Sequence, residues 1–104
     1  MKILGVTACI AGVAHTYMAA EALEQAAKAR GHEIKVETQG AGGIENYITK
    51  EDIDNADCAI FAVDVGVTEA ERFDDIPTLE CKIKEVIKNA TKLIIELEDA
   101  VGVK

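Results

Sequence analysis

Short, mostly apolar segments separated by helix-forming segments constrain the fold of this 104-residue chain more than any other feature. Residues 2–8 and 57–63 lack the polar alternation of a half-exposed strand and are typical of strands covered on both faces. Residues 32–39 alternate polar and apolar side chains, and residues 78–81 form a short β-prone segment. These four segments are the predicted strands.

Three helical segments lie between and after the predicted strands. An Ala-rich segment over about 15–30 ends at Gly31, a common stop signal. A short helix opens at Thr49, a favoured N-cap residue followed by acidic side chains. A long amphipathic helix is predicted over about 82–101, because its apolar residues recur at three- and four-residue steps.

Spacing within the two long helices predicts which side chains they bury. In the first, Met18, Ala22 and Ala26 recur at every fourth position beside Leu23, which predicts a narrow stripe that packs closely on a sheet. The last helix has a predicted apolar ridge made of Ile83, Val86, Ile87, Ala90, Ile94, Leu97 and Val101.

Strands that alternate with helices predict an α/β fold, because parallel neighbours need right-handed crossover connections. We expect an open, four-stranded parallel sheet, in the order 2-1-3-4, with helices on both faces. In this order the winding reverses between the first and third strands, where ligands bind beyond the carboxyl ends. The length suits a single domain, 1–104.

Composition limits the partners and the compartment. A formal net charge of −8 counts against binding to nucleic acid or to an anionic membrane surface. Because no apolar run approaches the roughly 20 residues that span a bilayer, we expect no membrane insertion and a cytoplasmic location. The sequence predicts no metal site and no cofactor.

The three cysteines, Cys9, Cys58 and Cys81, are odd in number and unevenly spaced, which suits free thiols in a reducing compartment. Cys58 and Cys81 lie in apolar strand patterns and are interpreted as buried packing residues. His32 follows Gly31 in a turn and is predicted to be exposed.

Cys9 follows the first predicted strand and opens a loop that leads into a helix. Amides of such a loop, together with the positive end of the helix dipole, favour an anion and a reactive thiolate. We therefore predict that Cys9 is a nucleophile. The predicted phosphate-binding segment consists of Ile10, Ala11, Gly12, Val13, Ala14, His15 and Thr16.

The tyrosine-phosphatase loop offers a comparison, since there a cysteine is followed after five residues by Arg and then Ser or Thr. Here His15 takes the arginine position and Thr16 follows it. Without a bidentate guanidinium clamp or an obvious acid, a phosphothiol at Cys9 would persist, as a phosphoryl carrier requires. His15 is either an anion contact or a cap, and Thr16 either an N-cap or a phosphate ligand.

Several segments together resemble the fructose-type enzyme IIB domain of the bacterial phosphoenolpyruvate-dependent sugar phosphotransferase system: residues 9–16, 18–23, 36–40 and 71–73. The resemblance covers nearly the whole chain. It implies a phosphotransferase in which Cys9 accepts phosphate from a phosphohistidine of the IIA component. It also implies transfer to a sugar, fructose by default, held by the membrane IIC permease.

The resemblance has one departure and leaves alternatives. The family loop usually reads Cys-Pro-Thr-Gly or Cys-Pro-Met-Gly, whereas Ile10 and Ala11 stand here, which restores an amide donor after Cys9. A small cysteine-dependent phosphatase and a non-catalytic, phosphorylation-dependent regulatory module are the competing functions. Gln39, Gly40 and Gly42 either line the site or form a plain loop.

Overall fold

The computed structural model describes residues 1–9, 13–40 and 42–102. In chain order its elements are β1 (Lys2–Ala8), α1 (Val13–Ala29), β2 (Glu33–Gly40), β3 (Gly43–Glu45), α2 (Lys50–Asp54), β4 (Cys58–Val63), the 3₁₀ helix η1 (Ala70–Phe73), β5 (Thr78–Cys81) and α3 (Ile83–Val101).

The strands form one sheet in the order β3-β2-β1-β4-β5. Pairing of β1 with β2 and β4, and of β4 with β5, is parallel. The predicted order of the four parallel strands is therefore confirmed. The prediction omitted β3, which pairs antiparallel with the end of β2 and begins at Gly43, whose φ is 109°. A strand of three exposed residues beside glycines has no apolar pattern, so the sequence predicts a loop there.

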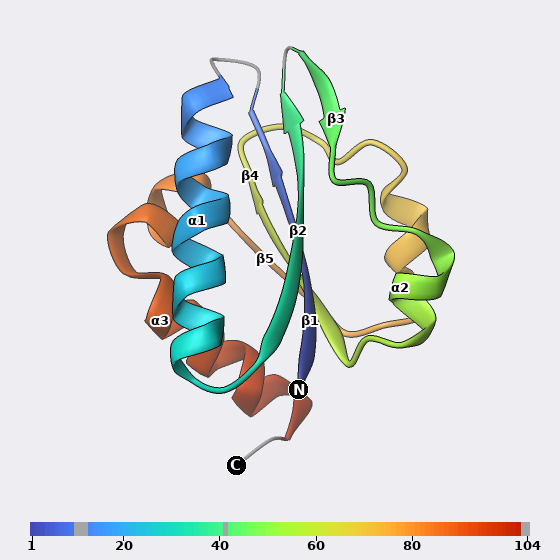
Figure 1. Ribbon diagram of the computed structural model, residues 1–104, viewed down its shortest axis with the longest axis vertical. Helices are drawn as coiled ribbons and strands as arrows, with labels where there is room; N and C mark the ends of the chain where they lie inside the picture. Colours follow the sequence, from blue (N-terminus) through green and yellow to red (C-terminus); the bar gives the residue numbers. More distant parts are fainter. Residues whose placement is uncertain (10–12, 41, 103–104) are drawn as a thin grey trace.

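Helices cover both faces of the sheet, as predicted (Figure 1). On one face α1 and α3 enclose a core that includes Leu23, Ile60 and Ile94. On the other face α2 and η1 cover a second core around Val6 and Phe61. Strands β1 and β4 contribute side chains to both cores. Their two faces are therefore both buried, which is why their sequences are apolar throughout and do not alternate.

The buried face of α1 agrees only in part with the predicted stripe. Of the predicted residues, Leu23 and Ala26 are buried, whereas Met18 is 51% exposed. Ala19, Ala20 and Ala27 are buried as well, because an Ala-rich segment offers alternative small-residue faces. Gly5 of β1 lets α1 pack closely on the sheet. A Cβ at Gly5 would lie 3.2 Å from Cγ2 of Val36 on β2 and 3.5 Å from Cδ1 of Leu23 on α1.

The last helix, α3, is confirmed over Ile83–Val101 but is bent rather than continuous (Figure 1). Asn89 has an extended backbone, and its Oδ1 accepts a hydrogen bond from the Lys92 amide at 3.2 Å, like an internal N-cap. Most of the predicted ridge is buried. The bend leaves Ile87 39% exposed and buries Leu93, which the regular spacing did not include.

The short helix α2 begins after Thr49, as predicted. Thr49 Oγ1 accepts from the Asp52 amide at 3.2 Å, and Asp52 Oδ2 accepts from the Thr49 amide at 2.9 Å, forming a capping box. Lys35 of β2 donates to the same carboxylate at 2.7 Å. This hydrogen bond from Lys35, followed by the one from the Thr49 amide, lowers the pKa of Asp52 to about 2.

Charged side chains join the amino ends of β1 and β2 to α3. Arg30 donates to both Glu98 carboxylate oxygens, at 2.6 and 2.7 Å. The His32 ring contacts Glu98 at 2.6 Å through Nε2 and the Met1 amino group at 2.9 Å through Nδ1. The prediction that His32 is exposed was wrong, since its side chain is only 7% exposed. A partner 66 residues away cannot be read from a turn motif.

Within residues 1–9, 13–40 and 42–102, no helix combines the length and apolar character that crossing a membrane requires.

Candidate functional site

Cys9 lies at the carboxyl end of the sheet, one residue beyond β1. Its amide donates to the Gln39 carbonyl of β2 at 3.2 Å, while the Asp64 amide after β4 donates to the Ala8 carbonyl at 2.9 Å. These bonds extend both ladders of the central strand. The structure thus places Cys9 between β2 and β4, at the predicted reversal of strand order.

A cavity of about 410 Å³ lies beside Cys9. Its described lining residues are Ala8, Cys9, Gln39, Gly40, Gly43, Ile44, Val65, Gly66 and Thr68. Cys9 is only 3% exposed, and besides lining the cavity it belongs to the apolar core beneath α1 and α3. Of the residues left open between a lining role and a plain loop, Gln39 and Gly40 line the cavity, whereas Gly42 is exposed and outside the described lining.

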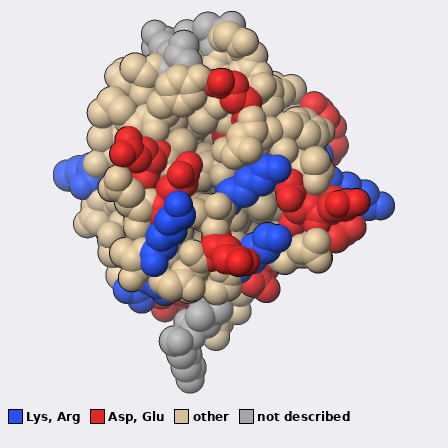
Figure 2. Space-filling view, in the orientation of Figure 1, with Lys and Arg blue, Asp and Glu red and all other residues tan. Residues whose placement is uncertain are grey.

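The described lining of this cavity contains neither a carboxylate nor a basic side chain. In Figure 2 the upper part of the visible face is mostly tan with one red patch, whereas charged side chains of both signs are interspersed across its middle. An incoming anion would therefore meet no repelling carboxylate on the described walls. Its charge would have to be stabilised by dipoles, chiefly backbone amides.

The first turn of α1 begins earlier than predicted. The helix starts at Val13, so Thr16 is its fourth residue, wholly buried, and the interpretation of Thr16 as an N-cap was wrong. The Thr7 hydroxyl donates to the Thr16 carbonyl at 3.1 Å and fixes this turn against β1. Ala14 and His15 are exposed. Ile10, Ala11 and Gly12 of the predicted phosphate loop lie outside the described residues.

A buried ion pair that the sequence analysis missed lies behind the cavity. Glu37 of β2 is completely buried, and Arg72 of η1 donates to both of its carboxylate oxygens at 2.9 Å. The Ile48 amide adds a third bond at 2.7 Å and the Gln39 side chain a fourth at 2.6 Å. The segments 36–40 and 71–73 were noted for their resemblance only, and nothing local indicates that they meet.

Hydrogen bonding keeps this buried carboxylate ionised. Burial by itself would raise the pKa of Glu37, but the bonds from Arg72, Ile48 and Gln39 outweigh it, so the pKa lies below its ordinary value. Arg72 also donates to the carbonyls of Glu69, Ile48 and Thr68, at 2.9, 2.8 and 3.2 Å. All five guanidinium protons thus have protein acceptors, and Arg72 has no donor left for a ligand.

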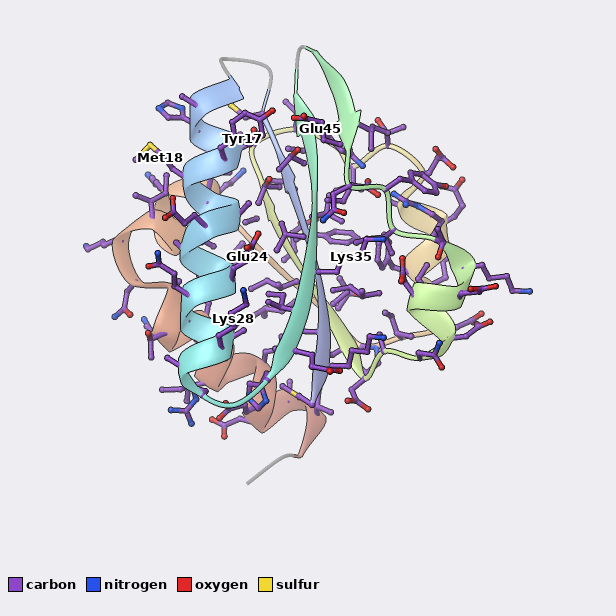
Figure 3. All side chains as sticks on the ribbon, viewed as in Figure 1. Tyr17, Met18, Glu24, Lys28, Lys35 and Glu45 are labelled. Atoms are coloured by element: carbon purple, nitrogen blue, oxygen red, sulfur yellow. The ribbon has the colours of Figure 1, made fainter. Side chains whose placement is uncertain are left out.

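A side-chain bridge joins α1 to β3 near the carboxyl end of the sheet. The Tyr17 hydroxyl donates to the Glu45 carboxylate. Figure 3 shows the two side chains extending toward each other, while Met18 points away from them. The bridge holds the exposed edge strand close to the beginning of α1.

The other two cysteines have the surroundings of packing residues, as predicted. Cys58 is fully buried and Cys81 is 9% exposed. Burial raises the pKa of Cys58 to about 11 and that of Cys81 to about 12, so both thiols stay protonated at neutral pH. In the part of the chain that the structure describes, no group of three His, Cys, Asp or Glu side chains is arranged to hold a metal ion.

Comparison with known proteins agrees with this geometry. Residues 4–96 match the family model described as "PTS system, Lactose/Cellobiose specific IIB subunit". The "PTS system fructose-like EIIB component 2" of Escherichia coli K12 is 50% identical over 97 residues, which cover 93% of this chain and 92% of that protein.

Two further relatives show the same domain in different settings. The solution structure of an enzyme IIB subunit from Escherichia coli K12 superposes with a TM-score of 0.91 at 44% identity, covering 97% of this chain and 94% of that one. The "PTS system 2-O-alpha-mannosyl-D-glycerate-specific EIIABC component" of Escherichia coli K12 is 49% identical over 88% of this chain, but this match covers only 14% of that longer protein.

Proposed function

Since the chain belongs to the IIB family of the bacterial sugar phosphotransferase system, whose members are phosphotransferases that carry phosphoryl groups during sugar uptake, we propose that Cys9 is its phosphoryl-carrying residue. One observation carries this assignment. Cys9 lines a cavity at the carboxyl edge of the sheet, where the winding of the strands reverses, and the described lining residues of this cavity carry no charge.

In the first step, the Cys9 thiolate attacks the phosphorus of a phosphohistidine on the IIA component. A sulfur–phosphorus bond forms in line as the nitrogen–phosphorus bond breaks, and the imidazole leaves with the bond's electron pair and takes up a proton. The negative charge of the transferring group spreads over its three equatorial oxygens. Those oxygens need donors rather than covalent chemistry from the protein.

Backbone amides of the segment from Ile10 to Thr16 are the proposed donors. Val13 and Ala14 open α1, and amides of a first helical turn have no acceptor within their own helix. The absence of carboxylates from the described cavity lining supports anion binding there. The absence of Arg and of a side-chain acid from the same lining favours a carrier over a phosphatase.

In the second step, a hydroxyl oxygen of the sugar attacks the phosphorus, the sulfur–phosphorus bond breaks, and Cys9 leaves as a thiolate. The hydroxyl proton passes to solvent or to a base on the permease. We propose fructose as the sugar, since the similar Escherichia coli component is named fructose-like, and the IIC permease as the protein that holds it. The chain would act as one domain, 1–104, on the cytoplasmic face of the membrane.

Phosphoryl transfer from labelled phosphoenolpyruvate through the upstream components tests the assignment. The wild-type chain should form an acid-stable adduct, and Cys9→Ser should form none. Cys58→Ser and Cys81→Ser are matched controls that should retain the label. The proposal is wrong if Cys9→Ser is labelled as fully as the wild type. Sugar phosphate formed with the IIC permease from fructose, mannose and mannosylglycerate then identifies the acceptor.

A further inference from the structure

Gln39 ties together two chain segments that line the Cys9 cavity, the end of β2 and the segment after β4. Its side-chain Oε1 accepts a hydrogen bond from the Thr68 amide at 2.8 Å, and its Nε2 donates to the Thr68 carbonyl at 3.1 Å. One side chain thus binds both polar groups of a single residue in the other segment. At 7% exposure Gln39 is shielded from competing water.

The same residue also holds Cys9. The Gln39 carbonyl accepts the Cys9 amide, while the Ala8 carbonyl accepts the Asp64 amide. The segment 64–68 is therefore fastened at both ends to the strands that carry and flank Cys9. Between these two points lie Val65 and Gly66, which line the cavity.

The buried ion pair orients the Gln39 amide. Because the Glu37 carboxylate only accepts hydrogen bonds, the Gln39 group 2.6 Å from it must be the NH₂ end. Arg72 fixes that carboxylate through two bonds and reaches the Thr68 carbonyl as well. The side-chain carbonyl of Gln39 is thereby directed at the Thr68 amide. Hydrogen bonds from residues behind the cavity lining thus hold Gln39 in one orientation.

We infer that Gln39 is a positioning residue for phosphoryl transfer, which holds the segment 65–68 at a fixed distance from Cys9. The inference rests on the proposed function of Cys9. In-line transfer depends on geometry, and a displacement of about 1 Å can cost a hundredfold in rate. Gln39 touches no reacting atom in this scheme; it acts through the wall that it fastens.

The test compares Gln39→Met with Gln25→Met. Methionine keeps the length of the side chain but removes both bonds to Thr68 and the bond to Glu37, so the unfolding measurement is needed to separate lost stability from lost positioning. Gln25 undergoes the same substitution on the exposed face of α1, where its side chain donates a hydrogen bond to Glu21 one turn earlier. Single-turnover transfer from the phosphorylated IIA component is followed at increasing donor concentration, and the unfolding of each variant by urea is measured in parallel.

For Gln39→Met we expect the maximal transfer rate to fall about 10- to 100-fold, with the half-saturating donor concentration within about twofold of wild type. Gln25→Met should have the maximal transfer rate and the half-saturating donor concentration of the wild type. The inference fails if folded Gln39→Met transfers at the wild-type rate, or if only the half-saturating concentration changes. Should Gln39→Met not fold, Gln39→Ser, which leaves room for water beside Glu37, takes its place.

A second readout separates this inference from the function of Cys9. The rate at which iodoacetamide alkylates Cys9 is measured against pH by peptide mass spectrometry, without any partner protein. If Gln39 positions the wall, Gln39→Met changes this profile and Gln25→Met does not; identical profiles overturn the inference. If the wild type accepts no phosphoryl group while the profile of Gln39→Met differs, the proposed function fails, and what stands is only that Gln39 holds the cavity wall beside Cys9.

Discussion

The two ends of the sheet use charge in opposite ways. At the amino ends of β1 and β2, Arg30 and His32 bind Glu98, and the amino group of Met1 contacts His32. At the carboxyl ends, the described lining of the Cys9 cavity is uncharged. The Glu37–Arg72 ion pair lies nearby, but its charged groups form hydrogen bonds to each other and to other protein groups.

This difference shows how one small sheet separates two tasks. Ion pairs at the amino end join α3 to β2 and need no empty space. At the carboxyl end an empty, uncharged cavity is required if an anion is to enter, so the charged groups are placed behind the wall and paired there. The predictions below test whether the two ends differ in this way.

The largest effect is expected from Arg72→Met. Glu37 would keep its buried carboxylate without a counterion, and breaking a buried pair in this way costs about 3–5 kcal/mol in the free energy of unfolding. Arg30→Met at the other end should cost less, since the Arg30 side chain is 38% exposed and water can replace it. Urea unfolding of both variants measures the difference.

The double variant Glu37→Gln/Arg72→Met is the control for this prediction. Removing the carboxylate's charge should recover part of the stability lost in Arg72→Met. If Arg72→Met and Arg30→Met lose equal free energy of unfolding, burial does not make the loss of the Glu37–Arg72 pair more costly than the loss of the Arg30–Glu98 pair.

A charge placed in the cavity should impair transfer next most strongly. A side chain at Gly66 meets no atom within 4 Å of its Cβ, so Gly66→Asp fits without a clash. A carboxylate about 5 Å from the phosphoryl group, at an effective dielectric of about 20, opposes its entry by about 3 kcal/mol, roughly a hundredfold in rate. Single-turnover labelling of Cys9 measures this loss.

Gly66→Asn separates charge from bulk in that experiment, because it has the same shape without the charge. The loss in Gly66→Asp should exceed that in Gly66→Asn and should shrink as salt is added. Equal losses in the two variants would mean that bulk, rather than charge, obstructs the cavity.

The smallest effect concerns pH at the amino end. Hydrogen bonds from Arg30 and then His32 lower the pKa of Glu98 to about 2, from an ordinary value of 4.5. A lowered folded-state pKa contributes stability that is present above about pH 4.5 and is lost as the pH falls toward 2. The stability advantage of wild type over Glu98→Gln should therefore narrow between pH 5 and pH 2.

Thermal unfolding at a series of pH values checks this expectation. Glu96→Gln, on the exposed side of the same helix, is the matched control and should follow the wild-type profile. A difference in unfolding temperature between wild type and Glu98→Gln that stays constant from pH 5 to pH 2 would contradict the prediction.

Much of the fold follows from patterns a few residues long. Apolar runs predicted four parallel strands and their order, and helix signals predicted the start of α2 after Thr49. The position of Cys9 at the end of β1 follows from the same patterns, because a strand's end and a helix's beginning are local events. Failures occurred where local signals are weak or ambiguous: β3, the buried face of α1 and the bend at Asn89.

The connections around the cavity depend on the folded chain. Glu37 and Arg72 are 35 residues apart, Gln39 and Thr68 are 29 apart, and His32 and Glu98 are 66 apart. A polar side chain in a strand or loop pattern gives no sign of its partner, because its hydrogen bond forms only once packing has excluded water and brought distant segments together. Short-range periodicity thus specifies the sheet and the cysteine at its edge, while long-range packing specifies the walls around that cysteine.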